Sequence, residues 1–174
     1  MREKLIHEKG SFLRDSVFAA SDGLVTTFAV VAGSQGASLG PTVVLIMGFA
    51  NLLADGISMS SGTYLGVKSE MEYMKAEGDG HAPEASPFKQ GLISFFSFDV
   101  AGLIPLLPYV FGLNNAFYIS VLLVFVVLFT IGVLKGLFIN KHWLKSGLEM
   151  LLVGGMAAVV AYLTGHILES LISK

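Results

Sequence analysis

Residues Phe49–Glu70, FANLLADGISMSSGTYLGVKSE, belong to an apolar segment that begins near Thr42 and is long enough to cross a lipid bilayer. Within it, Asn51, Asp55 and Met59 are spaced four residues apart. On an α-helix this spacing places the three side chains on one face. A carboxylate within hydrocarbon costs about 2.5–3.5 kcal/mol on insertion scales. An intramembrane aspartate aligned with an amide and a thioether therefore indicates a functional site.

The composition of the whole chain is that of an integral membrane protein. Of its 174 residues, 53% are hydrophobic and only 14% are charged, whereas soluble domains carry about 25% charged residues. We expect one transmembrane domain over residues 1–174, with no separate soluble module and no cleavable signal peptide. The chain has no cysteine, which excludes thiolate metal sites.

Five apolar segments of suitable length follow one another along the chain. Helices of about 20 residues match a hydrocarbon core of ~30 Å, whereas the strands of a membrane barrel would be half that length and would alternate in polarity. We therefore predict an all-α membrane protein with five transmembrane helices, at about residues 17–34, 42–66, 91–111, 116–134 and 147–168. Pro105 and Pro108 should kink the third helix.

The distribution of Lys and Arg predicts the orientation of these helices. Ten of the eleven basic residues precede the first helix, or lie between the second and third or between the fourth and fifth. By the positive-inside rule that side is cytoplasmic, so the N-terminus is cytoplasmic and the C-terminus is outside. Residues 67–90 then form a cytoplasmic loop. Its Glu70 and Glu72 could collect divalent cations, although a solvated linker is the commoner role of such a loop.

Each intramembrane polar residue also has a purely structural interpretation. Asp22 could accept hydrogen bonds from helix N–H groups or cap a break in its helix beside Gly23, and Asp55 could be protonated and bonded to a neighbouring helix. A methionine such as Met59 is usually core filling, and a structural role is favoured for Asp99. Against these interpretations, carboxylate oxygens combined with a thioether suit a transition metal. Carboxylates that also take protons suit metal–proton exchange.

No enzyme is expected from the sequence. It contains no nucleotide-binding glycine loop, no His-Glu zinc motif and no paired cysteines. Two intramembrane aspartates could form a proteolytic dyad. However, helix rise places Asp22 about 9 Å and Asp55 about 16 Å from the cytoplasmic ends of their spans, so this interpretation is not favoured.

Three stretches of the sequence resemble the vacuolar iron transporter family. They are ASDGLVTTFAVVAGSQGA (20–37), GFANLLADGISMSSGTYLGVKSE (48–70) and SFFSFDVAGLIPLLPY (94–109), and GGMAAVVAYLTG (154–165) agrees with the family pattern. The resemblance implies a five-helix homodimer that exports ferrous iron or manganese from the cytoplasm in exchange for protons. It also implies that Asp22 of the SDGL motif and Met59 of the ISM motif line the metal path.

Two features depart from the pattern of that family. Some members carry a glutamate at the position of Asn51, whereas this chain has an amide there and Asp55 one turn later. Plant-type members also have a cytoplasmic metal-binding domain between the second and third helices, for which residues 67–90 are too few. The chain is therefore identified as a short form of the family that lacks this domain.

We accordingly expect a transporter of Mn²⁺ and Fe²⁺ without a prosthetic group. Asp22, Met59, Asp55 and Asn51 would contact the metal, and H⁺ would be the coupling ion. The competing hypothesis is a non-transporting membrane scaffold whose acidic residues serve helix packing.

The expected partners are metal ions, membrane lipid and a second copy of the chain, and no nucleic acid. Helix rise places Asp22 and Met59 at similar depths, about 9 and 10 Å. A two-fold axis beside the first helix would therefore bring two of each together in a four-ligand site. The host membrane would be the plasma membrane in a prokaryote, and a vacuolar membrane or another endomembrane in a eukaryote.

Overall fold

The computed structural model describes the backbone of residues 2–78 and 86–172, and the side chains of residues 10–78 and 86–172. Every regular element within these ranges is helical. In chain order the elements are α1 (Arg2–Gly36), α2 (Pro41–Ala76), α3 (Pro87–Leu103), the 3₁₀ turn η1 (Ile104–Leu106), α4 (Leu107–Val110), α5 (Ala116–Phe138) and α6 (Trp143–Ile172).

The predicted all-α membrane architecture is confirmed. Among the residues that the structure describes, five helical segments are long and apolar enough to cross a membrane: Gly10–Gly36, Pro41–Ala76, Pro87–Val110, Ala116–Phe138 and Trp143–Ile172. Helices satisfy their backbone hydrogen bonds internally, which is what a segment surrounded by lipid requires.

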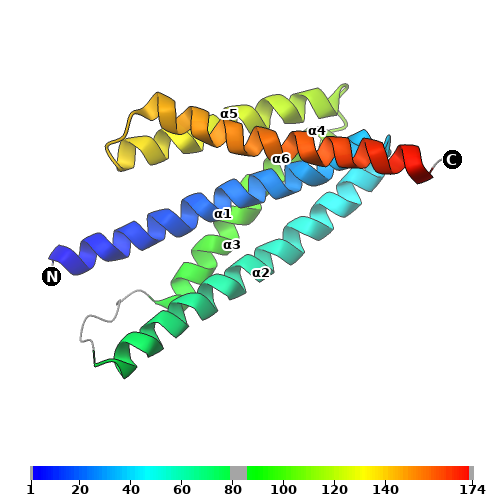
Figure 1. Cartoon of the computed structure of the whole chain (residues 1–174). Coiled ribbons are helices and arrows are strands. Elements are labelled where there is room, and N and C mark those ends of the chain that lie inside the picture. The colour runs from blue at the N-terminus through cyan, green and yellow to red at the C-terminus, as the bar shows by residue number, and fades with distance from the viewer. Residues whose placement is uncertain (1, 79–85, 173–174) are drawn as a thin grey trace.

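Helix α1 lies in the middle of the bundle and packs against α2, α3, α5 and α6 (Figure 1). Helices α2 and α3 lie on one side of it, and the α5–α6 hairpin lies on the other. Glycine allows the closest of these approaches, because the backbone of Gly33 in α1 lies where a side chain at Gly165 of α6 would project. Close approach of backbones at small residues is how helices gain van der Waals contact in lipid.

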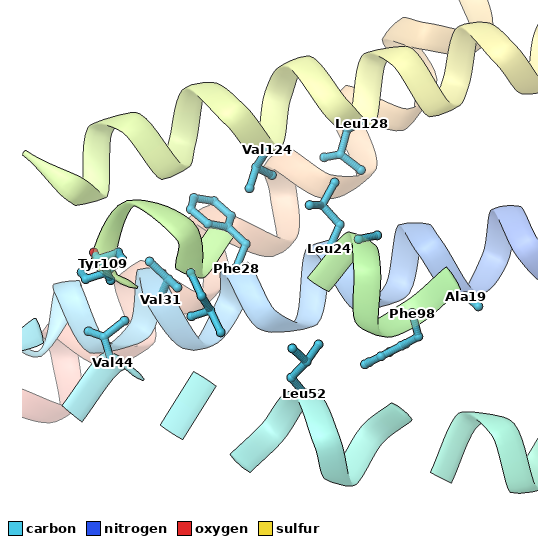
Figure 2. Close-up of a cluster of buried hydrophobic side chains, with 12 residues drawn as sticks. Ala19, Leu24, Phe28, Val31, Val44, Leu52, Phe98, Tyr109, Val124 and Leu128 are labelled. Carbon is cyan, nitrogen blue, oxygen red and sulfur yellow. The ribbon is translucent and has the colours of Figure 1, made fainter. Parts of the chain in front are cut away.

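The hydrophobic core surrounds α1 and draws residues from its neighbours. Leu24, Phe28 and Val31 of α1 are at most 3% exposed, and Figure 2 shows them between α5 above and α2 below. The other buried members of this cluster are Ala19, Val44, Leu52, Phe98, Ala101, Leu106, Tyr109, Val124 and Leu128. The core therefore joins α1 to every other long helix, and α6 contributes only partly buried residues to it.

The two prolines interrupt the third spanning segment as predicted. Helix α3 ends at Leu103, the 3₁₀ turn η1 contains Pro105, and α4 contains Pro108. Proline has no backbone N–H to donate to the preceding turn. The hydroxyl of Ser120 in α5 donates a hydrogen bond of 2.6 Å to the carbonyl oxygen of Pro105, which ties the interrupted segment to its neighbour.

Helix α2 extends past the predicted end of its span. The sequence suggested a loop over 67–90, but α2 continues to Ala76 and α3 begins at Pro87. Residues 79–85 of that loop lie outside the described residues. The hydropathy of the chain falls after Gly66, but the Lys, Glu, Met and Ala residues that follow are good helix formers. Hydropathy marks where a span ends, whereas backbone hydrogen bonds determine where its helix ends.

Most of the basic residues lie on helix ends and connecting segments at one end of the bundle. Helix α1 begins there, α2 and α5 end there, and α3 and α6 begin there (Figure 1). The basic residues on those segments with described side chains are Arg14, Lys68, Lys75, Lys89, Lys135, Lys141 and Lys145. We call this end of the bundle the basic end.

Candidate metal centre

Asn51, Asp55 and Met59 lie on α2, which is a continuous helix from Pro41 to Ala76, and their spacing places them on one face of it. All three side chains are half-buried. We call this set the α2 polar face. The residues that follow two of them, Leu52 and Gly56, are buried against the rest of the bundle. The α2 polar face therefore lies at the edge of the packed interface, partly accessible from outside the single chain.

Asp22 on α1 is also half-buried. Its carboxyl group and that of Asp55 are close enough to interact electrostatically. The hydroxyl of Thr26 donates to the backbone carbonyl of Asp22 at 2.8 Å, and not to its carboxylate. Like charges at such a separation repel one another, and repulsion is strong where water is excluded. A cation or a proton shared by the two groups would remove this repulsion.

The interpretation of Asp22 as a helix cap is wrong. Helix α1 runs without a break from Arg2 to Gly36, through Asp22 and Gly23. Gly23 has a packing role instead, because the backbone carbonyl of Phe98 in α3 occupies the space that a side chain at Gly23 would need. This close approach brings Asp99, the next residue of α3, to the level of Asp22.

Asp99 lies against α2 on the side where Gly56 is buried. A Cβ atom added to Gly56 would be 2.5 Å from Oδ2 of Asp99 and 3.0 Å from its Cγ. Both carboxylate oxygens of Asp99 are buried, and no hydrogen-bond partner for them occurs among the described residues. A buried carboxyl group without a partner is costly. The sequence favours a structural role for Asp99, but no hydrogen bond to a described residue of a neighbouring helix accounts for its position.

The other two residues of the α2 polar face differ in their surroundings. The side-chain nitrogen of Asn51 is buried and finds no acceptor in the described part of the chain. Met59 packs against the hydrophobic core, so at least part of its burial is ordinary core packing.

The described side chains of a single chain do not complete a coordination sphere. Over residues 10–78 and 86–172, no three His, Cys, Asp or Glu side chains lie close enough together to hold a metal ion. Asp22 and Asp55 thus form a pair of carboxylates, and further ligands would have to come from Asn51, Met59, water or another molecule.

Glu70 and Glu72, the candidates for collecting metal, are exposed on the extension of α2 beyond its predicted span. Glu72 lies 3.9 Å from the Lys68 ammonium, with 66% of its side chain exposed, and such surface pairs contribute little to stability. Glu70 interacts electrostatically with Arg14 of α1. Each glutamate is therefore near a basic group, and among the side chains that the structure describes the two form no cluster with a third acidic residue.

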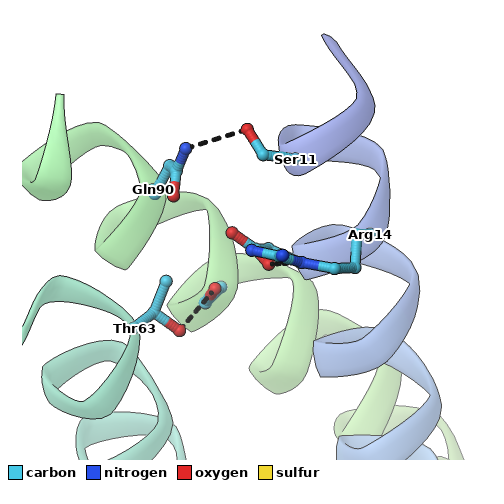
Figure 3. A network of polar contacts seen from close by, with 6 residues as sticks. Ser11, Arg14, Thr63 and Gln90 are labelled. Atoms are coloured by element: carbon cyan, nitrogen blue, oxygen red, sulfur yellow. Dashed lines mark hydrogen bonds and ion pairs between the residues drawn. The ribbon is translucent and has the colours of Figure 1, made fainter. Parts of the chain in front are cut away.

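A set of polar contacts at the basic end was not identified from the sequence (Figure 3). The amide nitrogen of Gln90 donates to the hydroxyl of Ser11 at 3.1 Å, which links α3 to α1. The hydroxyl of Thr63 donates to that of Ser94 at 3.1 Å, which links α2 to α3. Isolated Ser, Thr and Gln residues in apolar helices form no recognisable pattern, so only the packed structure reveals these pairs.

The chain is similar to known proteins along most of its length. A family model described as the VIT family matches residues 13–82 and 78–166. The vacuolar iron transporter of Toxoplasma gondii is 28% identical over 97% of this chain and 78% of its own length. Vacuolar iron transporter 1 of Oryza sativa subsp. japonica is 29% identical over 88% of this chain and 84% of its own length. Asp22 and the α2 polar face lie inside the matched ranges.

Proposed function

Because this chain belongs to the VIT family, we propose that it is a multi-pass membrane transporter that moves Mn²⁺ and Fe²⁺ out of the cytoplasm in exchange for protons. The curated relatives are named as vacuolar iron transporters, which supports a metal as the substrate. The observation that carries the proposal is that Asp22 on α1 and Asp55 on α2 lie within two adjoining membrane-spanning helices, near enough for their carboxyl groups to interact electrostatically.

The chemistry of exchange follows from the charge of this pair. Two ionised carboxylates carry a charge of −2, which either one divalent cation or two protons would neutralise. The pair is neutral when it holds a metal and also when it holds two protons, so the protein can change conformation in either form. Changing conformation with the pair empty and charged in a low dielectric would be costly. Binding of a metal requires loss of the protons, which couples the two fluxes.

The remaining ligands give a preference among metals. The carbonyl oxygen of Asn51 and the thioether of Met59 lie on the same helix face as Asp55. Oxygen ligands alone would accept Mg²⁺ or Ca²⁺, whereas a thioether favours transition metals. This donor set supports Mn²⁺ and Fe²⁺ as the cargo, and the protein needs no resident metal for this function.

We further propose a homodimer in which the first helices lie near the two-fold axis. One chain supplies the Asp22–Asp55 pair but no third acidic or histidine ligand among the described residues. The α2 polar face is only half-buried in the single chain, which leaves room for a symmetry mate. A two-fold axis would place two copies of Asp22 and of Met59 around one metal.

The direction of transport depends on orientation. The basic end of the bundle is assigned to the cytoplasm by the positive-inside rule, which would place Glu70 and Glu72 where metal enters. The membrane is then a vacuolar or other endomembrane in a eukaryote, or the plasma membrane in a prokaryote.

Reconstitution into proteoliposomes tests this function. Purified protein should move Mn²⁺ and Fe²⁺ across the bilayer, and a pH gradient of one sign should accelerate the flux while the opposite gradient slows it. A metal-sensitive dye and a pH-sensitive dye inside the vesicles would record both ions. Glu149→Gln removes an exposed carboxylate on α6 and serves as the matched active control. Absence of flux for both metals under either gradient would favour a scaffold instead.

A further inference from the structure

A groove of about 500 Å³ opens between α1, α3 and α5, and α2 contributes no residue to it. Its walls are mainly apolar and include Leu13 of α1, Val100 of α3 and Phe138 of α5. The volume is within the range of about 300–1,000 Å³ that is usual for small-molecule sites. All three helices are spanning segments, so the groove faces the bilayer.

The groove runs along the helices from the basic end toward the membrane interior. On α1 it extends from Leu13 to Ala20, which corresponds to about 10 Å at ~1.5 Å per residue. On α5 it extends from Phe138, the last residue of the helix, back to Ile131. These dimensions suit the first part of an acyl chain lying parallel to the helices.

The groove has one positively charged lining residue, and it lies near the basic end of the bundle. Lys135 is the one charged residue among those that line it, and it lies three residues before the end of α5. No ion pair of Lys135 occurs within residues 10–78 and 86–172. A lysine near a helix end extends its ammonium group to the level of the lipid headgroups. The phosphate of a lipid is the complementary charge at that level.

A second polar group lies beside this end. Ser16 lines the groove on α1. For comparison, Ser21 of the same helix donates its hydroxyl to the backbone carbonyl of Val17 at 2.5 Å. Ser16 makes no comparable bond to any residue that the structure describes, so its hydroxyl is available to an oxygen of the lipid glycerol or ester region.

We propose that this groove binds one anionic phospholipid, with its phosphate at Lys135 and an acyl chain against Val100 and Ile131. The chain would fill space between α1 and α5 that the side chains of the protein leave empty, and filled space restores dispersion contacts. Lys135 would give preference for an anionic headgroup, because basic pockets between membrane helices bind such headgroups.

Native mass spectrometry of the purified full chain tests the headgroup. The protein is titrated with phosphatidylglycerol or phosphatidylcholine, and one retained phosphatidylglycerol is expected in preference to phosphatidylcholine. Lys135→Gln should lower this preference about fivefold, the factor that one lysine near an anionic surface supplies. Lys141→Gln, which removes an exposed lysine outside the groove, should leave it unchanged. Equal losses in the two variants, or no preference in the wild type, would overturn the proposal.

A second pair of variants tests where the acyl chain binds. Val100 lines the groove and is 66% exposed, whereas Val126 on α5 is 54% exposed and lies outside it. Because both positions are exposed, tryptophan at either should be compatible with folding, which gel filtration checks. Val100→Trp should abolish retention of both lipids, and Val126→Trp should retain them as the wild type does. Unchanged retention by Val100→Trp would show that the lipid sits elsewhere and would overturn the proposal.

Discussion

The carboxylate of Asp99 on α3 lies directly against Gly56 of α2, so that one of its oxygens is 2.5 Å from where a Cβ at Gly56 would be. Gly56 follows Asp55 in the sequence. Helix α3 therefore packs immediately behind the α2 polar face, and the position of Asp55 depends on the missing side chain of its neighbour.

Gly56→Ala should destabilise the protein by about 1–3 kcal/mol, as overpacking of an interior usually does. The added methyl group would displace the short side chain of Asp99. Thermal unfolding in detergent measures this loss. Gly66→Ala on the same helix is the matched control, because nothing lies within 4 Å of a Cβ there. Alanine at an exposed helical position should be neutral or stabilise by up to ~1 kcal/mol.

The double variant Gly56→Ala/Asp99→Ala identifies the source of that cost. Removing the carboxylate makes room for the methyl group, so most of the lost stability should return. If the double variant is as unstable as the sum of the two single variants, the two residues do not interact, and the clash must involve the helix backbone.

Asp22→Asn should reduce metal flux at least tenfold, since tenfold corresponds to only ~1.4 kcal/mol and the variant loses an ionisable ligand. The amide has nearly the same shape, and the carboxylate makes no hydrogen bond to a described residue, so folding should survive. Flux in proteoliposomes and elution in gel filtration measure the two properties. Asp55→Asn should give a partial or complete loss. Normal flux in Asp22→Asn would assign Asp22 to helix packing alone.

The variant Met59→Leu tests whether Met59 binds the metal or only packs in the core. Met59 packs against the hydrophobic core, and leucine nearly conserves its volume, so the stability cost should be under about 1.5 kcal/mol. Loss of the soft thioether should weaken Mn²⁺ and Fe²⁺ more than Mg²⁺. Uptake of Mn²⁺ against excess Mg²⁺ is the measurement, and Mg²⁺ should compete better in the variant. Unchanged competition in a folded variant would leave metal choice to the carboxylates.

Cysteine cross-linking tests the proposed dimer. The chain has no native cysteine, so single substitutions give unambiguous products. Thr26→Cys or Ala29→Cys on α1 should form a disulfide with its symmetry mate if the first helices meet at the axis. Val126→Cys on the exposed face of α5 is the control and should not. A protein that is monomeric both in mild detergent and in native membranes contradicts the dimer.

Much of the fold could be predicted because hydropathy reports directly on membrane burial. The five spans and the interruption at Pro105 follow from residue type alone. The end of α2 could not be predicted in this way, because residues such as Met71 and Glu72 continue a helix after the apolar run stops.

For the candidate site, the sequence predicts which residues share a face within one helix, but not which residues of different helices lie close together. The four-residue spacing of Asn51, Asp55 and Met59 fixes their shared face. The interaction of Asp22 with Asp55 depends instead on how α1 approaches its neighbours, which the contact of Gly23 with Phe98 helps to set. Which of these side chains bind metal stays a prediction, because proximity within one chain does not determine coordination.

The length of α2 has a mechanical consequence. Its 36 residues form a rod of about 54 Å, whereas the hydrocarbon core is only ~30 Å thick. Asp55 and Ala76 belong to the same uninterrupted helix and are separated by about 32 Å. A change in tilt of ten degrees about Asp55 would therefore move Ala76 by about 6 Å. A probe attached to that tip, outside the bilayer, would sense rearrangements that begin around a cargo ion deep within it.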